Sequence, residues 1–267
     1  MSEATRRSTG WWGEFRFAAG ETTTWCIGPL RLAMRRARHE WQLGYGWVEV
    51  TDAEVVCSVA TTTDPLPAYE NQERYVFRET GEALQIRPAL ADRPVISRPV
   101  TPFHLPAGEE ATLFVSSPVW LHLSVPEPAC DLTEVPIQRS SDTWFGPSTR
   151  EGQLCYDSRT AGRLHLEEVP KRPHRAVTRV VIRNEGSDAL RLERLSLPAP
   201  YLAVFEADDG LLWTTPVTLV RDHTGEMGMV KIHERPPQEA RGAKRLSPPR
   251  EKPTQGSLVR ALSALFG

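Results

Sequence analysis

The sequence predicts a mostly β protein built from antiparallel, sandwich-like sheets in two packed units. Three observations predict it. Short apolar segments alternate with polar residues at a period of two, Gly or Pro bounds these segments, and 23 prolines are spread through the 267 residues. Alternation of this kind places one face of a strand against a core, and proline breaks helices because it lacks an amide donor. Long helices are therefore not expected.

The N-terminal region is dense in tryptophan and predicts a β-hairpin. Phe15, Phe17 and Trp25 alternate with polar or small residues on either side of a turn at Gly20. Because alternate residues of a strand face the same side, we expect these aromatic side chains to share a core.

Residues 30–41 allow two interpretations. Leu30, Leu32 and Met34 alternate like a strand, whereas Leu30, Met34 and Trp41 also fit one face of a helix. A Gly-Pro pair precedes the segment and a clean two-residue period follows it, so strands are favoured.

Five further segments carry strand signals at the spacing typical of sandwiches and barrels. A surface loop with two prolines is expected just before them, at 64–73. The segments are 74–78, 83–88, 95–100, 111–115 and 119–123, and the last two resemble consecutive antiparallel strands.

A second unit is predicted to begin at Pro170, after a Trp-rich β domain over residues 1–169. It covers 170–234 and is sandwich-like, either separate from the first unit or continuous with it. Asn184-Glu-Gly186 predicts a hairpin turn between two of its strands, and Asp208-Asp-Gly210 predicts another.

Residues 256–267 predict a short amphipathic helix, connected by a basic, proline-rich linker at 235–255 that is expected to be disordered. Ser257 is a suitable N-cap, and four apolar side chains follow it in one helical stripe. A helix this short is not stable alone. It needs a receiving surface, which is the protein's own sheet, the groove of a protein partner, or the face of a bilayer. The candidate partner-binding residues are Leu258, Leu262, Leu265 and Phe266.

Composition argues against several classes of protein. The net charge of -2 gives no global reason to bind nucleic acid. No apolar run approaches the ~20 residues of a transmembrane helix, and the N-terminus lacks the apolar stretch of a signal peptide, so a cytoplasmic location is expected. The four cysteines form no CxxC pair, and they are expected to be reduced thiols without a metal or cofactor.

No catalytic signature is complete. His39-Glu40 begins the zinc-protease motif HExxH, but Leu43 stands where its second histidine belongs. Gly44-Tyr-Gly46 begins like a dinucleotide fingerprint, but Glu49 stands at the third glycine. Ser148 lacks the second glycine of a nucleophile elbow. The sequence therefore favours a protein that is not an enzyme.

The central stretch 141–157 combines aromatic, charged and glycine residues, as binding loops do. In one interpretation two aromatic side chains wall a small pocket and three charged ones orient a polar ligand. In the other, the aromatic side chains plug the interior of a sandwich. The candidate ligand-binding residues are Asp142, Trp144, Arg150, Tyr156 and Asp157.

Several short motifs carry a family resemblance. They are Trp12-Gly13, Glu21-Thr22, Ile27-Gly28-Pro29-Leu30 with Glu40-Trp41, and Ser141-Asp-Thr-Trp-Phe-Gly146 with Cys155-Tyr156. The chain resembles the family catalogued as domain of unknown function 432 over about its first two thirds, and more loosely to residue 233. The resemblance implies a prokaryotic β-rich protein with no assigned catalytic residue. It also implies that the early Trp-rich strands and the Trp144 loop share one domain.

The leading functional hypothesis is a non-enzymatic binding or scaffold protein that engages a protein partner through sheet surfaces and the terminal helix. The alternative is a small-ligand-binding module, or an enzyme without a recognisable motif, that uses residues 141–157. A membrane-proximal accessory role is a further alternative.

Overall fold

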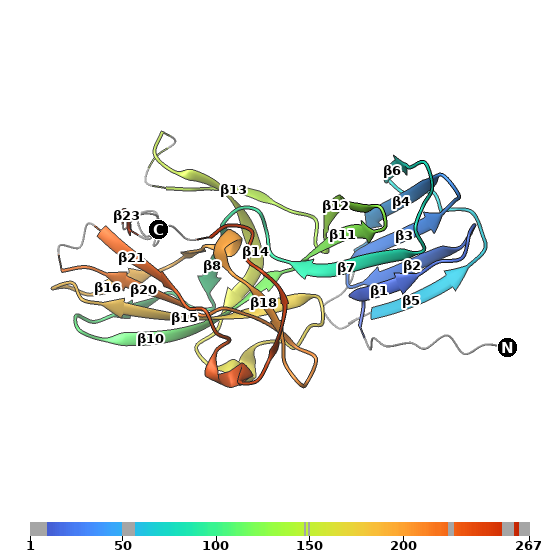
Figure 1. Cartoon of the computed structure of the whole chain (residues 1–267). Helices are drawn as coiled ribbons and strands as arrows, with labels where there is room; N and C mark the ends of the chain where they lie inside the picture. Colours follow the sequence, from blue (N-terminus) through green and yellow to red (C-terminus); the bar gives the residue numbers. More distant parts are fainter. Residues whose placement is uncertain are drawn as a thin grey trace. The chain divides into compact units, whose positions relative to one another are not determined.

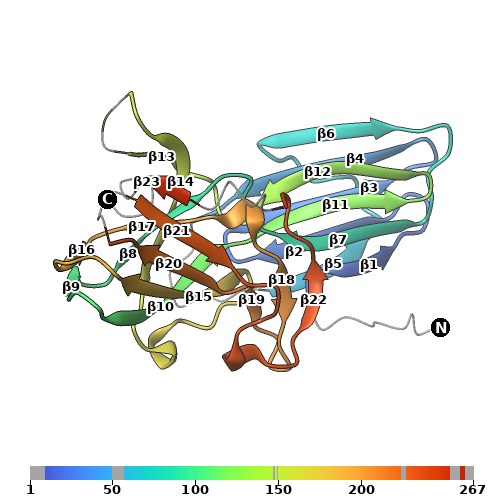
Figure 2. The ribbon, with the colours of Figure 1, turned by 60° about the vertical axis from the view of Figure 1, so that its left-hand side comes forward.

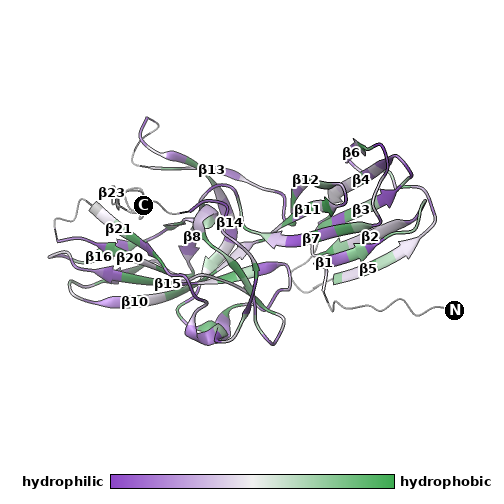
Figure 3. Ribbon diagram, viewed as in Figure 1, coloured by the Kyte–Doolittle hydropathy of each residue, from purple (hydrophilic) through white to green (hydrophobic). Residues whose placement is uncertain are grey.

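Strands dominate the computed structural model of the protein, as the alternation in its sequence predicts. The structure describes residues 10–49, 57–146, 148, 150–223, 227–252 and 259–261. Strands account for 55% of the residues and helices for 4%, and both hydrophobic and hydrophilic residues occur along the strands (Figure 3). The mostly β fold class is therefore confirmed.

Two compact units make up the chain (Figure 1). The first comprises Met1–Pro88 and Trp120–Arg139, and the second comprises Ala89–Val119 and Ser140–Gly267. This division differs from the boundary predicted at Pro170. The chain returns to the first unit to supply two strands, and a local two-residue period cannot report such a return.

The first unit is a sandwich of two sheets (Figure 2). The five-stranded sheet has the order β5-β2-β3-β4-β6, and it consists of β2 (Thr22–Ile27), β3 (Leu30–Arg36), β4 (Glu40–Trp47), β5 (Cys57–Thr62) and β6 (Asn71–Val76). The four-stranded sheet has the order β1-β7-β11-β12, and it consists of β1 (Gly13–Arg16), β7 (Ala83–Ala89), β11 (Trp120–Pro126) and β12 (Ala129–Pro136).

Aromatic side chains fill the interior of this sandwich. Trp25 and Trp41 come from the five-stranded sheet and have no exposed surface. Phe17 follows β1, and its ring contacts that of Trp41 edge to face at 4.9 Å between centroids. Both β3 and β4 are strands, so the strand interpretation of residues 30–41 is confirmed and the helical one is wrong.

The hairpin predicted around Gly20 is wrong, because the strands on its two sides belong to different sheets. β1 pairs with β7, whereas β2 pairs with β3 and β5. Gly20, with a φ of +82°, turns the chain from one sheet to the other. Phe15 and Trp25 still meet, with ring centroids 5.1 Å apart, but from opposite layers. The alternation in the sequence correctly identified which face of each strand is buried, but the predicted pairing of the strands was wrong.

The second unit contains one large sheet and two smaller ones. The large sheet has the order β22-β18-β19-β15-β20-β21-β23, with β10 paired to β15. Its strands are β10 (Glu110–Pro118), β15 (Arg175–Asn184), β18 (Val204–Glu206), β19 (Leu212–Thr214), β20 (Val217–Arg221), β21 (Met227–Ile232), β22 (Lys244–Ser247) and β23 (Val259–Ala261).

The smaller sheets and the short helices complete the second unit. A four-stranded sheet has the order β13-β14-β8-β17 and a two-stranded sheet pairs β16 with β9. These strands are β8 (Val95–Pro99), β9 (Phe103–Leu105), β13 (Asp142–Phe145), β14 (Gln153–Gly162), β16 (Leu190–Leu192) and β17 (Leu195–Leu197). The 3-10 helices are η1 (Leu166–Glu168), η2 (Ala199–Tyr201) and η3 (Gln238–Ala240).

Strand β15 is the centre of the large sheet. One of its edges pairs with β10 along its length, while the other edge pairs with β19 near Val177 and with β20 from Val180 onward. Leu113 of β10 packs against Gly162 of β14, where a Cβ atom would lie 2.7 Å from the leucine side chain. The four-stranded sheet therefore meets this part of the large sheet closely.

Two further pairings differ from the sequence prediction. The segments predicted as consecutive antiparallel strands, β10 and β11, pair with β15 and β12 in different units. The predicted hairpin at Asn184-Glu-Gly186 is a turn, but β16 beyond it pairs with β9 instead of returning along β15. By contrast, β18 and β19 form the antiparallel pair predicted around Asp208-Asp-Gly210.

Part of the predicted linker lies in regular structure. Residues 238–240 form η3 and residues 244–247 form β22, which pairs with β18 at the edge of the large sheet. Ala240 is buried in a hydrophobic cluster. Composition predicted disorder because the segment is short of apolar residues, but the sheet edge and this cluster provide the contacts that the segment itself lacks.

Candidate functional site

Three neighbouring strands of the second unit build the floor of a pocket. Ser116 of β10 pairs with Val177 of β15, and Val177 also pairs with Trp213 of β19. Because directly paired residues point to the same side of a sheet, these three side chains form one row on one face. Arg175 lies two residues before Val177 and therefore joins the same face.

Three segments far apart in the sequence cover this face and enclose the pocket. η1 and the residues after it supply Leu166 and Val169, the turn between β18 and β19 supplies Leu211, and η3 supplies Ala240. The turn depends on Gly210, whose φ of +77° is rarely adopted by residues with a side chain. The pocket, which is partly open to solvent, has a volume of about 820 Å³, which is within the range of sites for small ligands.

The walls of the pocket are mainly apolar. Seven lining residues belong to one hydrophobic cluster or pack against it: Leu166, Val169, Val177, Ala207, Leu211, Trp213 and Ala240. Covering such surface with an apolar group releases about 25 cal/mol for each Å² removed from water. The pocket is therefore suited to an apolar body.

One charged side chain of the lining, Arg175, is almost completely buried, with 3% of its surface exposed. Its Nε donates to the Ser116 hydroxyl at 2.9 Å, and one terminal nitrogen donates to the Ser116 carbonyl at 2.6 Å. The same nitrogen lies 3.0 Å from the Ser158 carbonyl and 2.9 Å from the Thr160 hydroxyl. These bonds hold the guanidinium in one position at the wall.

Four acidic residues line the pocket, and three of them are exposed. Lys171 Nζ is 3.6 Å from an Asp209 carboxylate oxygen, and Arg179 Nε is 3.3 Å from one of Glu239. Two of the four lining carboxylates therefore have a cationic partner. The four are Glu167, Asp208, Asp209 and Glu239; the first three are exposed, whereas the Glu239 side chain is 26% exposed.

A buried histidine, His174, precedes Arg175. It is 8% exposed, and its Nδ1 has no hydrogen-bond partner in the described part of the chain. Burial, together with the positive charges of Arg175 and Arg172, lowers the pKa of His174 to about 4. Because a lowered pKa disfavours the charged imidazolium, this ring is neutral near pH 7.

Antiparallel strands β13 and β14 bring three of the five predicted ligand residues together. Asp142 pairs directly with Tyr156, and Trp144 lies on the same face. The Tyr156 hydroxyl donates to Asp92 at 3.1 Å, and burial followed by the charge of Asp92 raises the pKa of Tyr156. Trp144 is 43% exposed, and its Nε1 donates to the Ser148 carbonyl at 2.8 Å.

The other two predicted ligand residues lie apart from these three. Asp157 follows Tyr156 on β14 and therefore faces the opposite side, where one carboxylate oxygen accepts from the Arg159 amide at 3.0 Å and the other is 3.8 Å from Arg98. Arg150 is exposed beyond the end of β13. The five predicted residues are not among those that line the pocket.

The predicted partner-binding residues Leu258, Leu262, Leu265 and Phe266 lie outside the described residues. Within the segment predicted as a helix, the structure describes 259–261, which form β23. This strand pairs with β21 in antiparallel register, with Met229 opposite Val259.

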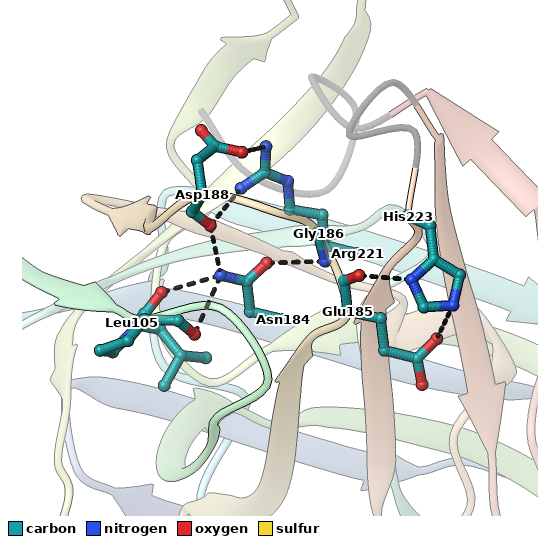
Figure 4. Close-up of polar contacts among 8 residues, drawn as sticks. Leu105, Asn184, Glu185, Gly186, Asp188, Arg221 and His223 are labelled. Carbon is teal, nitrogen blue, oxygen red and sulfur yellow. Dashed lines mark hydrogen bonds and ion pairs between the residues drawn. The ribbon is translucent and has the colours of Figure 1, made fainter.

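A buried polar cluster closes the C-terminal end of β15 (Figure 4). Asn184 is 1% exposed, and its side-chain oxygen accepts from the Gly186 amide at 3.2 Å. Arg221 donates to an Asp188 carboxylate oxygen at 2.6 Å. The Asn184 side-chain amide donates to three carbonyl oxygens, those of Leu105, Pro106 and Asp188, at 2.8 to 3.1 Å. Because Asn184 binds backbone throughout, the cluster stabilises a turn.

Among the described residues, no three His, Cys, Asp or Glu side chains gather as a metal site. No helix among the same residues is long and apolar enough to cross a membrane.

No sequence motif indicates the pocket, because its lining comes from separate segments around 116, 166–177, 207–213 and 239–241. Pro170, Pro173 and the Asp208-Asp-Gly210 turn marked loops at two of them. No local signal indicated that these loops would cover one face of one sheet.

The fold and the pocket define a mostly β protein of two units with an apolar cavity in the second. The family model described as Protein of unknown function (DUF432) matches residues 11–266, so the chain belongs to this family. The match confirms the resemblance to this family and extends it to nearly the whole chain. The resemblance also implied that the early Trp-rich strands and the Trp144 loop share one domain, but the structure places the strands in the first unit and Trp144 in the second. No curated protein and no solved structure is significantly similar to the chain.

Proposed function

We propose that the chain is a non-enzymatic binding protein whose second unit holds a small ligand in the pocket over β10, β15 and β19. The observation that carries the proposal is a cavity of about 820 Å³ with apolar walls and a fixed buried arginine. Sites for small molecules combine these features, with an apolar lining and a few polar groups of fixed position.

Ala207→Trp tests the proposal. Ala207 lines the pocket at the turn between β18 and β19 and packs against the hydrophobic cluster. Its backbone amide donates to Leu211, a bond that a new side chain leaves in place. The indole would occupy the cavity. Ala68→Trp, at an exposed loop residue of the first unit, is the matched control.

The measurement is a thermal-shift screen of a metabolite collection against the wild type and both variants. A ligand at 100 times its Kd adds about 2.7 kcal/mol to the stability of the protein that binds it. At least one compound should stabilise the wild type and Ala68→Trp but not Ala207→Trp. A collection without any stabilising compound, or equal stabilisation of all three proteins, would contradict the proposal.

A second candidate function is the binding of a protein partner, which the face of β13 and β14 favours. Trp144 and Leu154 are directly paired there, and they are 43% and 42% exposed. Exposed apolar side chains that gather on one face are typical of interaction sites. Here β13 is also an edge strand, with backbone groups open to pairing.

Cross-linking of a partner to the wild type, followed by mass spectrometry, tests this second function. The double variant Trp144→Ser, Leu154→Ser should lose the partner, whereas Val76→Ser, at an apolar residue exposed on β6, should keep it. Deletion of residues 253–267 tests the C-terminal segment in the same assay. A partner retained by the double variant and by the deletion would exclude both surfaces.

A further inference from the structure

The charges of the pocket are sorted by depth. Three of its four carboxylates, Glu167, Asp208 and Asp209, are exposed, and Lys171 and Arg241 are exposed as well. The fourth, Glu239, has 26% of its side chain exposed and forms an ion pair with Arg179. The basic groups withdrawn from solvent are two arginines, because Arg175 is buried and Arg172 is half-buried. A charge acts more strongly where less water screens it. Because Arg179 offsets the charge of Glu239, the charge that the two arginines bring into the cavity is positive, although the lining as a whole carries as many acidic as basic residues.

Guanidinium groups at the wall of an apolar cavity select for one kind of ligand atom. Arginine presents planar N–H donors that match the two oxygens of a carboxylate, and it is less strongly hydrated than an ammonium group. Arg175 is held by the Ser116, Ser158 and Thr160 oxygens, so its charge is already positioned before a ligand arrives. A cationic ligand head would meet these arginines with like charge.

The rest of the lining selects for the body of the ligand. Trp213, Val177 and Val169 form a continuous apolar surface with Leu211 and Ala240. A polyanion such as a nucleotide would leave this surface uncovered, and it would need more buried donors than two arginines supply. A single anionic group on an aliphatic or aromatic body satisfies both parts of the cavity.

Resting on the proposed function, we propose that the pocket binds an amphipathic carboxylate, with its apolar body against Trp213 and its carboxylate toward Arg172 and Arg175. The neighbouring His174, kept neutral by burial and by the same two arginines, is consistent with a positive local potential. The carboxylate head makes the ligand bind more tightly than a neutral analogue with the same chain. The apolar body contributes equally to the binding of the ligand and of the analogue.

The test compares three probes with the same ten-carbon chain, decanoate, decan-1-ol and decyltrimethylammonium, by isothermal titration calorimetry at pH 7.5. Decanoate should bind at least ten-fold more tightly than decan-1-ol, and decyltrimethylammonium should bind most weakly. A charge-assisted hydrogen bond is worth about 1.5–3 kcal/mol, or roughly ten-fold to a hundred-fold in Kd.

Arg172→Gln is the informative variant, because Arg175 also anchors Ser116 and its loss would disturb the wall. Arg172→Gln should weaken decanoate binding about ten-fold and leave decan-1-ol unchanged. Arg191→Gln, at an exposed arginine of the same unit that pairs with Glu193, should change neither. If Arg172→Gln fails to fold, the three probes on the wild type still decide the outcome.

The failures of the two proposals are distinguishable. If decanoate and decan-1-ol bound equally and Ala207→Trp abolished both, the pocket would be supported as a binding site. The inferred preference for a carboxylate would be overturned. The inferred preference for a carboxylate would also be overturned if decyltrimethylammonium bound most tightly or if no probe bound. In either case the metabolite screen would still test whether the pocket binds a ligand. Decanoate binding that Ala207→Trp leaves unchanged lies elsewhere and would overturn the inference.

Discussion

The two units are built from the same alternating strands, but one has a filled interior and the other leaves a cavity. In the first unit Trp11, Trp25, Trp41 and Phe17 are almost fully buried, and neighbouring rings meet edge to face. In the second unit Trp213 is 3% exposed and yet borders a space of about 820 Å³. Burial of a tryptophan therefore does not show whether its surroundings are completely filled.

The difference lies in what covers each sheet. A second sheet covers the five-stranded sheet of the first unit, and its regular side chains fill the space between them. Irregular segments, η1, the turn at Gly210 and η3, cover the face that carries Trp213. Loops adapt less regularly to a flat face than strands do, and they are where binding residues concentrate. We therefore expect the first unit to contribute mainly stability, and we propose ligand binding for the second.

The largest expected effect contrasts two tryptophans, one from each unit. Trp41→Ala should destabilise the first unit by about 3–5 kcal/mol, since removing a fully buried ring leaves a cavity. Trp144→Ala should cost less than about 1 kcal/mol, because Trp144 is 43% exposed and gives up one hydrogen bond. Urea denaturation followed by circular dichroism measures both. Equal losses would contradict the view that the first interior is filled.

Acid should act on the second unit through His174. Its folded pKa of about 4 lies below the value of about 6.5 expected in the unfolded chain. Between these values the unfolded state binds more protons, so stability rises with pH, by up to about 3 kcal/mol from pH 4 to 6.5. His174→Phe should remove this part of the pH dependence, and His223→Phe, at an exposed histidine, should retain it. Denaturation at pH 4.5 and 7 provides the comparison.

The sequence predicted the faces of strands better than their partners. The two-residue period correctly gave strands over 30–36 and 40–47 and the antiparallel pair around Asp208-Asp-Gly210. It failed at Gly20 and at Asn184, where the chain leaves one sheet for another. Alternation records which side of a strand is buried, whereas pairing depends on contacts far along the chain.

The candidate sites show the same difference between contacts near in the sequence, which could be predicted, and contacts far apart, which could not. Asp142, Trp144 and Tyr156 come together because β13 and β14 are close in sequence, and residue spacing predicts such a meeting. The pocket joins Ser116 to Ala240 through three strands and three loops, one of them in a stretch predicted as disordered. No spacing rule connects residues so far apart.

The polar cluster at the end of β15 offers a smaller effect. Asn184→Ala should cost about 1–3 kcal/mol, because three carbonyl oxygens lose a buried donor. Asn71→Ala is the control in the first unit, since Asn71 is half-buried and donates to the Tyr45 carbonyl at 3.3 Å. It should cost less than about 1 kcal/mol. A loss no larger for Asn184 than for Asn71 in chemical denaturation would mean that the cluster does not stabilise the turn.

The smallest effect changes sign between two neighbouring glycines of β4. A Cβ at Gly44 would lie 2.6 Å from the Tyr69 ring, whereas one at Gly46 would have 3.8 Å of room. Alanine in a strand gains about 0.5–1 kcal/mol over glycine, and overpacking costs about 1–3 kcal/mol. Gly46→Ala should therefore raise the melting temperature, and Gly44→Ala should lower it. Shifts of the same sign would show that Tyr69 does not pack on this face.

The central claim, that the second unit binds an amphipathic carboxylate beside Trp213, is tested most directly by NMR of the indole N–H groups. The chain has eight tryptophans, and the variants Trp213→Phe and Trp144→Phe assign the signals of two of them. On titration with decanoate, the Trp213 signal should shift and saturate while the Trp144 signal stays in place. A Trp213 signal that does not move at saturating decanoate would contradict the account.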